Sequence, residues 1–155
     1  DRLRELIGLY RSSWKSAGVP RDGQVMLAFH MFCHEDDNEA RRIAKGPLTD
    51  YLRGIVDATR AWKQGASTKD YPNYDKMVEY LEKQTFETQV GSGSAWVGSP
   101  EKLIDQIAEF TEGIGPFESA SLQVNFGNLD FDPAKRSMEL FSERVMPRFA
   151  HVSQS

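Results

Sequence analysis

The sequence predicts an α/β fold with parallel strands, and two stretches carry most of that prediction. Residues 119–149 have the pattern of a strand, a loop containing Gly127 and an amphipathic helix. Residues 24–33, Q-V-M-L-A-F-H-M-F-C, are almost wholly apolar without alternation, as in a strand that is covered on both faces. Strand-then-helix units build parallel sheets, in which ligands bind at the loops that follow the strands. We therefore expect the functional site in such loops, above all at residues 127–130.

Composition narrows the class of protein. A chain of 155 residues with 39% apolar and 27% charged content is typical of one globular domain. The net charge of −4, without a basic stripe, argues against nucleic acid as the partner. No apolar run approaches the roughly 20 residues that a membrane span requires. The single cysteine, Cys33, excludes an internal disulfide and favours a cytoplasmic protein.

The N-terminal half is expected to hold a helix, a strand and further helices. Apolar residues recur at helical spacing over residues 3–17, and Gly18 and Pro20 end that helix. After the strand at 24–33, Asp36 and Glu39 form a plausible capping box for the next helix.

The chain is expected to restart at Gly46 and Pro47 with a new amphipathic helix, followed by a polar loop and a helix capped by Asp75. A plain crossover needs only one helix. We therefore interpret residues 46–90 as a helical insertion, of the kind that shapes or covers an active site.

The C-terminal half is expected to hold two more strand-then-helix units. Residues 95–97 form a short strand, and Ser99 caps a helix that begins at Pro100. Residues 119–126 form the last strand, and Asp132 caps the last helix. The buried face of that helix is predicted to consist of Ala134, Met138, Phe141, Val145 and Phe149.

Three parallel strands leave the outer edges of their sheet unpaired. The chain also begins at Asp1 and is helical almost at once. We therefore expect residues 1–155 to be a single partial domain of a longer protein. Its partner strands would come from the rest of that protein or from a second copy of the chain.

Several segments, in order along the chain, resemble one enzyme family. V-G-S-P-E-K-L-I-D-Q-I at 97–107, S-L-Q-V-N-F-G at 121–127 and S-M-E-L-F-S-E-R-V-M-P-R-F at 137–149 resemble the C-terminal part of bacterial luciferase-like monooxygenases. V-M-L-A-F-H-M-F-C-H-E-D at 25–36 and S-T-K-D-Y-P-N-Y-D-K-M at 67–77 resemble the branch associated with polyketide and nonribosomal peptide pathways.

The resemblance implies a (β/α)8 TIM barrel that uses reduced FMN, or F420 in some branches, with O2 to oxygenate an organic substrate. It implies that this chain is the C-terminal half, with the last three strands, and that a flavin reductase supplies the cofactor. The fragment alone is expected to be inactive. The alternative is a non-catalytic α/β module that completes its sheet with a partner chain.

Candidate site residues lie where the predicted strands end. His34 suits catalytic proton transfer, because the pKa of an unperturbed histidine lies near neutrality. Glu35 beside it would contact substrate; the alternative is a solvated helix-capping loop. The resemblance adds cofactor contacts at Ser99, Asn125, Phe126 and Gly127. The alternatives for these four residues are simple helix capping and turn chemistry.

Three residues in the insertion are candidates for a lid over the substrate: Lys69, Tyr71 and Tyr74. An ordinary solvated loop is the alternative for them. No metal site is expected, because strand alternation places His30 and His34 on one face and Cys33 on the other.

Overall fold

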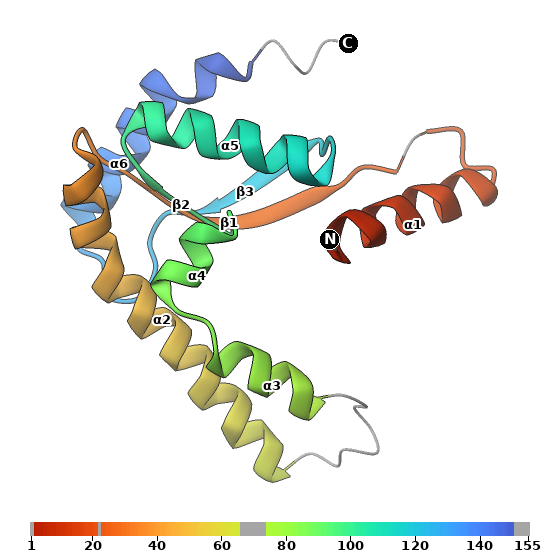
Figure 1. The fold of residues 1–155 in the computed structure, drawn as a ribbon, viewed down its shortest axis with the longest axis horizontal. Helices are drawn as coiled ribbons and strands as arrows, with labels where there is room; N and C mark the ends of the chain where they lie inside the picture. Colours follow the sequence, from red (N-terminus) through yellow and green to blue (C-terminus); the bar gives the residue numbers. More distant parts are fainter. Residues whose placement is uncertain (1, 22, 66–73, 151–155) are drawn as a thin grey trace.

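A computed structural model describes residues 2–21, 23–65 and 74–150, without the side chains of residues 61–65 and 74–75. Three parallel strands are each followed by a helix (Figure 1). In chain order the elements are α1 (Arg2–Ser16), β1 (Met26–Cys33), α2 (Asp37–Gly65), α3 (Tyr74–Glu82), α4 (Phe86–Gly91), β2 (Ala95–Gly98), α5 (Pro100–Ile114), β3 (Ser119–Gln123), α6 (Phe131–Arg144) and the 3-10 helix η1 (Met146–Arg148). The predicted α/β class with parallel strands is confirmed.

The first strand lies in the middle of the sheet, in the order β2-β1-β3. The short strand β2 pairs with the carboxyl half of β1, from His30 to Cys33, and β3 pairs with the amino half, from Met26 to His30. In a closed (β/α)8 barrel, consecutive strands are neighbours, so the second of three would be central. Here each partner covers half of one edge of β1, the longest strand.

The two faces of the sheet differ. The first, which we call the α5–α6 face, carries Phe29, Met31 and Cys33 of β1 together with Trp96 of β2, and helices α5 and α6 bury it. The other, the α2 face, carries Phe32 of β1, and α2 and α4 cover it. Figure 1 shows these two pairs of helices on opposite sides of the strands.

The α2 face is covered only at its carboxyl end. Met26, Ala28, Ser119 and Ser121 point to this side by strand alternation, and all four are exposed. Met26 is 67% exposed, whereas Phe29 on the α5–α6 face is 4% exposed. The amino half of the α2 face is therefore bare.

The predicted restart of the chain at Gly46 and Pro47 is wrong, because α2 continues through Pro47 as one helix of 29 residues. A proline within a helix removes one backbone hydrogen bond and costs about 3 kcal/mol. A continuous stripe at steps of four offsets that cost by packing against the sheet. Its members are Ala40, Ala44, Leu48 and Leu52. The predicted insertion thus begins in the middle of a helix and also includes α3 and α4.

The last β/α unit differs in detail from its prediction. Strand β3 ends at Gln123, and α6 begins at Phe131 with Asp130 at its N-cap, so Asp132 lies in the first turn. The helix buries Ser137 and Leu140 beside Ala134 and Phe141, while Met138 is 42% exposed. The buried face turns toward Ser137 because its Oγ accepts a hydrogen bond from the Cys33 N–H at 2.8 Å. That N–H lies beyond the end of the β1–β3 pairing.

Helix α1 projects from the body of the molecule (Figure 1). Arg11 holds it by pairing with Glu118 at 2.8 Å, and Glu118 also accepts a hydrogen bond from the Val25 N–H at 2.6 Å. Helix α1 forms as predicted, but Leu6 and Leu9 on it are exposed.

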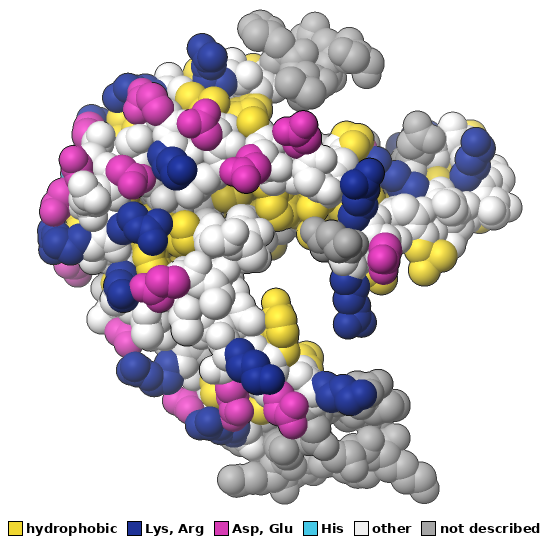
Figure 2. Space-filling view, viewed as in Figure 1, with side chains coloured by type: hydrophobic (Ala, Val, Ile, Leu, Met, Phe, Trp, Pro, Cys, Tyr) yellow, Lys and Arg dark blue, Asp and Glu magenta, His cyan; other side chains and the backbone are white. Residues whose placement is uncertain are grey.

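The surface carries mixed charge. Acidic and basic side chains alternate over the face shown in Figure 2, and apolar side chains gather in its hollow. Within the described residues, no helix is both long and apolar enough to cross a membrane.

Candidate active site

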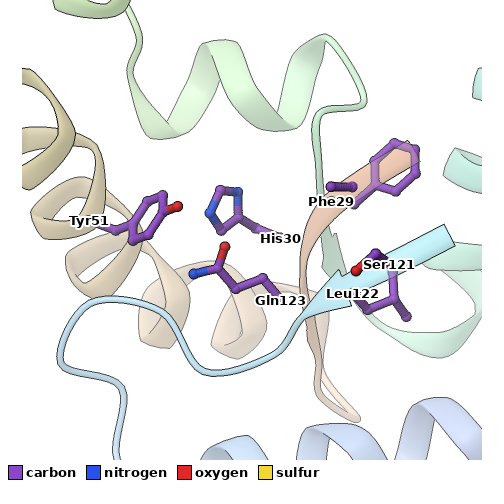
Figure 3. Close-up of a pocket in the computed structure, with 7 residues that line it drawn as sticks. Phe29, His30, Tyr51, Ser121, Leu122 and Gln123 are labelled. Carbon is purple, nitrogen blue, oxygen red and sulfur yellow. The ribbon is translucent and has the colours of Figure 1, made fainter. Parts of the chain in front are cut away.

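A pocket of about 260 Å³ lies on the α2 face, where β1 and β3 run side by side beneath α2. Its lining residues come from β1, α2 and β3: Ala28, Phe29, His30, Tyr51, Ser121, Leu122 and Gln123. Figure 3 shows the side chains of His30, Tyr51 and Gln123 converging, whereas Phe29 and Leu122 point away. The last two belong to the core of the α5–α6 face. The side chains that converge on the pocket are therefore those of His30, Tyr51 and Gln123.

The register of the sheet places His30 and Gln123 together. They are Cα partners across the β1–β3 pair, so they lie on the same face one strand spacing apart, about 4.8 Å. Two aromatic rings contact the imidazole edge-on. The Tyr51 ring lies 4.6 Å from it and the Phe126 ring 5.4 Å, at interplanar angles of 69° and 89°. These rings fix the plane of the imidazole.

The His30 ring is half-buried, and its Nε2 has no hydrogen-bond partner among the residues that the structure describes. Burial lowers the pKa of His30 below its usual value, because the charged form loses its hydration. Buried polar atoms normally have a partner. Nε2 is thus a buried polar atom in the wall of the pocket, unsatisfied by any of the described residues.

His34 lies at the carboxyl end of β1, as predicted, but its ring is partly engaged. Its Nδ1 accepts a hydrogen bond from the Asp36 N–H at 3.0 Å, and its Nε2 lies 3.9 Å from a Glu35 carboxylate oxygen. Asp36 caps α2 by accepting from the Glu39 N–H at 2.9 Å, but the predicted capping box is incomplete, because the Asp36 N–H donates to His34 and the Glu39 carboxylate binds Arg42. The loop is thus organised around the start of α2.

Glu35 is tied to α6. Its carboxylate binds Arg136 at 2.5 Å, and this hydrogen bond lowers the pKa of Glu35 below its ordinary value. The pair is half-exposed, so its contribution to stability is small. It links the β1–α2 loop to the last helix.

Ser99 is the N-cap of α5, where it accepts a hydrogen bond from the Lys102 N–H at 3.3 Å. The preceding Gly98 packs closely against Asp37, since a Cβ at Gly98 would lie 2.7 Å from Asp37 Oδ1. The structure therefore shows Ser99 in its capping role. It directly follows β2, the strand next to β1, at the same end of the sheet as His34.

The three candidate residues that follow β3 lie in different surroundings. Asn125 is exposed, whereas Phe126 is buried in the core of the α2 face and contacts His30. Gly127 has a φ of 58°, and a Cβ there would lie 2.1 Å from the carbonyl oxygen of Pro47. Glycine thus lets this loop pack directly on the α2 backbone. Phe126 reaches the pocket as a wall behind the imidazole.

The predicted lid lies mostly outside the described residues. Lys69 and Tyr71 fall in the segment that the structure does not describe, and Tyr74 is described only as the first residue of α3. No group of three His, Cys, Asp or Glu side chains within the described ranges could hold a metal ion. Burial raises the pKa of Cys33 to about 12, so its thiol stays protonated.

Local sequence patterns do not point to Tyr51 or Gln123 as site residues, and they suggest His30 only as a metal ligand. The sequence carries a signal for His30, which is a polar residue within an otherwise apolar strand, but none for Gln123, whose strand also contains Ser119 and Ser121. Pairing His30 with Gln123 required the strand register, which the sequence does not contain. The sequence indicates for Tyr51 only that it lies on the buried face of a helix.

The comparisons with known proteins agree with one another. The luciferase-like monooxygenase family matches residues 1–116. Monooxygenase RslO1 from Streptomyces bottropensis is 26% identical and covers 95% of this chain and 38% of its own, with a TM-score of 0.63. The search of the curated proteins gives no match.

Two further solved structures share the fold. The oxygenating constituent of 3,6-diketocamphane monooxygenase from the CAM plasmid of Pseudomonas putida, a type II Baeyer-Villiger monooxygenase in complex with FMN, is 22% identical with a TM-score of 0.67. It covers 94% of this chain and 39% of its own. Apo-MsnO8 is also 22% identical, covers 94% and 42%, and has a TM-score of 0.53.

The chain thus spans about two fifths of the length of these solved structures. Its three parallel β/α units and the partial coverage of the solved structures agree with the C-terminal part of a TIM barrel, as the resemblance implied, whereas the strand order β2-β1-β3 differs from that of a closed barrel. The family match covers most of the chain and agrees with the folds of the solved structures. This chain belongs to the luciferase-like monooxygenase family.

Proposed function

We propose that this chain is the C-terminal part of a flavin-dependent monooxygenase that uses reduced FMN and O2 to oxygenate an organic substrate. Family membership and the FMN complex of the diketocamphane enzyme support the proposal. The observation that carries it furthest is the pair of converging polar side chains, His30 and Gln123, at the pocket on the α2 face.

Reduced FMN, when bound, supplies the electrons that activate O2, and the protein binds, orients and shields the reactants. Tyr51 offers an aromatic surface, the buried Phe126 supports the His30 ring, and Gln123 offers an amide that can bond the polar edge of a planar ring. The pocket of about 260 Å³ is smaller than the roughly 300–1,000 Å³ of a complete ligand site. The residues therefore fit one wall of a flavin and substrate site.

No Lys or Arg is among the seven residues that line this pocket, so the cofactor phosphate would bind on other parts of the protein. The deazaflavin F420 would fit the same wall. His34 at the mouth is our proposed proton donor or acceptor, acting through its Nε2. Asn125 and Ser99 are proposed to contact the cofactor from the same end of the sheet. The substrate is proposed to come from polyketide or nonribosomal peptide metabolism, and a flavin reductase to supply the reduced cofactor.

The test is an anaerobic titration of reduced FMN into the whole protein that contains this chain, followed by mixing with O2. We expect saturable binding, and a rate of flavin reoxidation that differs from that of free reduced FMN. Gln123→Leu should weaken binding of flavin, substrate or both, whereas Gln106→Leu on α5 should change neither. A protein that binds neither FMN nor F420 would refute the proposal.

One observation favours a second function, a non-catalytic module that pairs with a partner chain. The amino half of the α2 face is bare, and Leu9 on α1 is 65% exposed. The rest of the barrel or a second copy of this chain would cover such surfaces. Sedimentation measurements decide this case: a stable complex without flavin binding supports the module, and a monomer that binds FMN excludes it.

A further inference from the structure

We propose that His30 and Gln123 together bind an uncharged, oxygen-bearing group of the organic substrate, such as a ketone or a phenol, and that the pocket rejects carboxylates. This inference rests on the proposed function and goes further, because it names the substrate class and the two residues that recognise it. The shape and the charge of the pocket on the α2 face support it.

The pair is built to bind one small polar group. His30 and Gln123 lie on neighbouring strands at the same register position, and both side chains point into the pocket (Figure 3). His30 Nε2 has no partner among the described residues. An imidazole nitrogen can donate or accept a hydrogen bond according to its tautomer, and a primary amide can do both. Together they match a carbonyl or hydroxyl oxygen.

The imidazole is held in place without using its ring nitrogens. Tyr51 and Phe126 meet it edge-on at 4.6 Å and 5.4 Å, which limits rotation of the ring. A binding group whose orientation is fixed in advance loses less conformational freedom when a ligand arrives. The aromatic contacts therefore fix the orientation of the imidazole in the wall of the pocket.

The pocket offers no positive charge. None of its seven lining residues is Lys or Arg. Two basic side chains of the covering helix α2 are paired outside the pocket, Lys45 with Glu87 at 2.6 Å and Arg53 with Asp50 at 3.3 Å. An ionised carboxylate placed here would lose hydration without gaining a counter-charge, which costs far more than burying a neutral group. Uncharged ligands are therefore favoured.

Equilibrium dialysis measures the affinity of the whole protein for three probes. The probes share one ring system and are 2-acetylnaphthalene, 2-naphthol and 2-naphthoate. We expect the ketone and the phenol to bind at least about tenfold more tightly than the carboxylate. His30→Leu and Gln123→Leu should each weaken ketone binding by about tenfold. His30→Gln, which keeps a neutral hydrogen-bonding group, should restore part of the loss.

Gln106→Leu is the matched control for Gln123→Leu. Gln106 is also a partly buried glutamine, but it lies in α5 and lines a different pocket. Its replacement should therefore leave the affinities for all three probes unchanged. Ser121→Lys tests whether an added positive charge lets the pocket bind a carboxylate, because Ser121 is exposed on the rim of the pocket. A lysine there should raise naphthoate binding more than ketone binding.

The same variants are titrated with lumiflavin, a flavin ring without a phosphate. If His30→Leu weakens lumiflavin and leaves the ketone unchanged, the pocket holds the cofactor ring and the inference is wrong. Equal affinity for naphthoate and ketone, or unchanged ketone binding in both leucine variants, also overturns it. Titration of reduced FMN tests the proposed function separately. Should a variant fail to fold, the probe ranking in the unaltered protein still decides.

Discussion

The two faces of the sheet carry side chains of opposite character. On the α5–α6 face, Phe29 stacks on Trp96 at 3.9 Å, and both residues are almost completely buried. On the α2 face, the neighbouring residue His30 keeps an unpaired nitrogen at a pocket, and Ser121 is exposed. Successive side chains of a β-strand point to opposite faces of the sheet, so β1 contributes side chains to both faces. At residues 29 and 30 of β1, therefore, the odd position packs in a core and the even position lies at the pocket, whereas Phe32 is buried on the α2 face as well.

The largest expected effect is on the stability of the α5–α6 face. Phe29→Ala removes a buried ring and leaves a cavity beside Trp96, so the free energy of unfolding should fall by about 3–5 kcal/mol. Ser121→Ala on the α2 face should change it by less than about 0.5 kcal/mol. Urea unfolding followed by tryptophan fluorescence measures both. Equal losses would mean that the two faces are not divided in this way.

Gly127→Ala should be the next most damaging change. The backbone there has a positive φ of 58°, and a Cβ would meet the Pro47 carbonyl oxygen at 2.1 Å, so we expect a loss of about 2–4 kcal/mol. Gly54→Ala in the exposed part of α2 has open space and should stabilise the protein by about 0.5–1 kcal/mol. Thermal unfolding of the two variants should shift in opposite directions. A harmless Gly127→Ala would show that the loop does not pack on α2.

Ser137→Ala tests the link between α6 and β1. The Ser137 hydroxyl accepts the Cys33 N–H and is completely buried, so its loss leaves that N–H without a partner. We expect a destabilisation of about 1–3 kcal/mol. Ser142→Ala is the control, since Ser142 is exposed on the same helix and bonds only the Glu139 carbonyl. Similar small effects for both variants would contradict this role of Ser137.

The smallest effect concerns pH. The pKa of His30 in the folded state is lowered by burial, so the unfolded chain binds a proton more readily. The contribution of the neutral His30 is complete above the unfolded pKa near 6.5, and it is lost as the pH falls through the lower folded pKa. Unfolding free energies at pH 8 and pH 5 should therefore differ more in the unaltered protein than in His30→Leu. An identical difference in both would contradict the burial of this ring.

Most elements could be predicted from the sequence, because local patterns decide them. The N-cap Ser99 with Pro100 gave the start of α5, and the unalternating apolar run gave β1. The helix break at Pro47 was wrong, since packing of the stripe from Ala40 to Leu52 outweighs the local cost of a proline. The residues that converge on the pocket could not be predicted together. His30, Tyr51 and Gln123 are far apart in the chain and meet only through strand register and helix packing.

The central claim is that the α2 face is the functional face of this chain. Hydrogen–deuterium exchange of the whole protein, with and without reduced FMN, tests it most directly. We expect the ligand to slow amide exchange at the carboxyl ends of β1 and β3, around His30 to His34 and Gln123 to Gly127, and to leave α5 and α6 unchanged. Protection confined to α5 and α6, or binding without protection at either strand end, would contradict the claim.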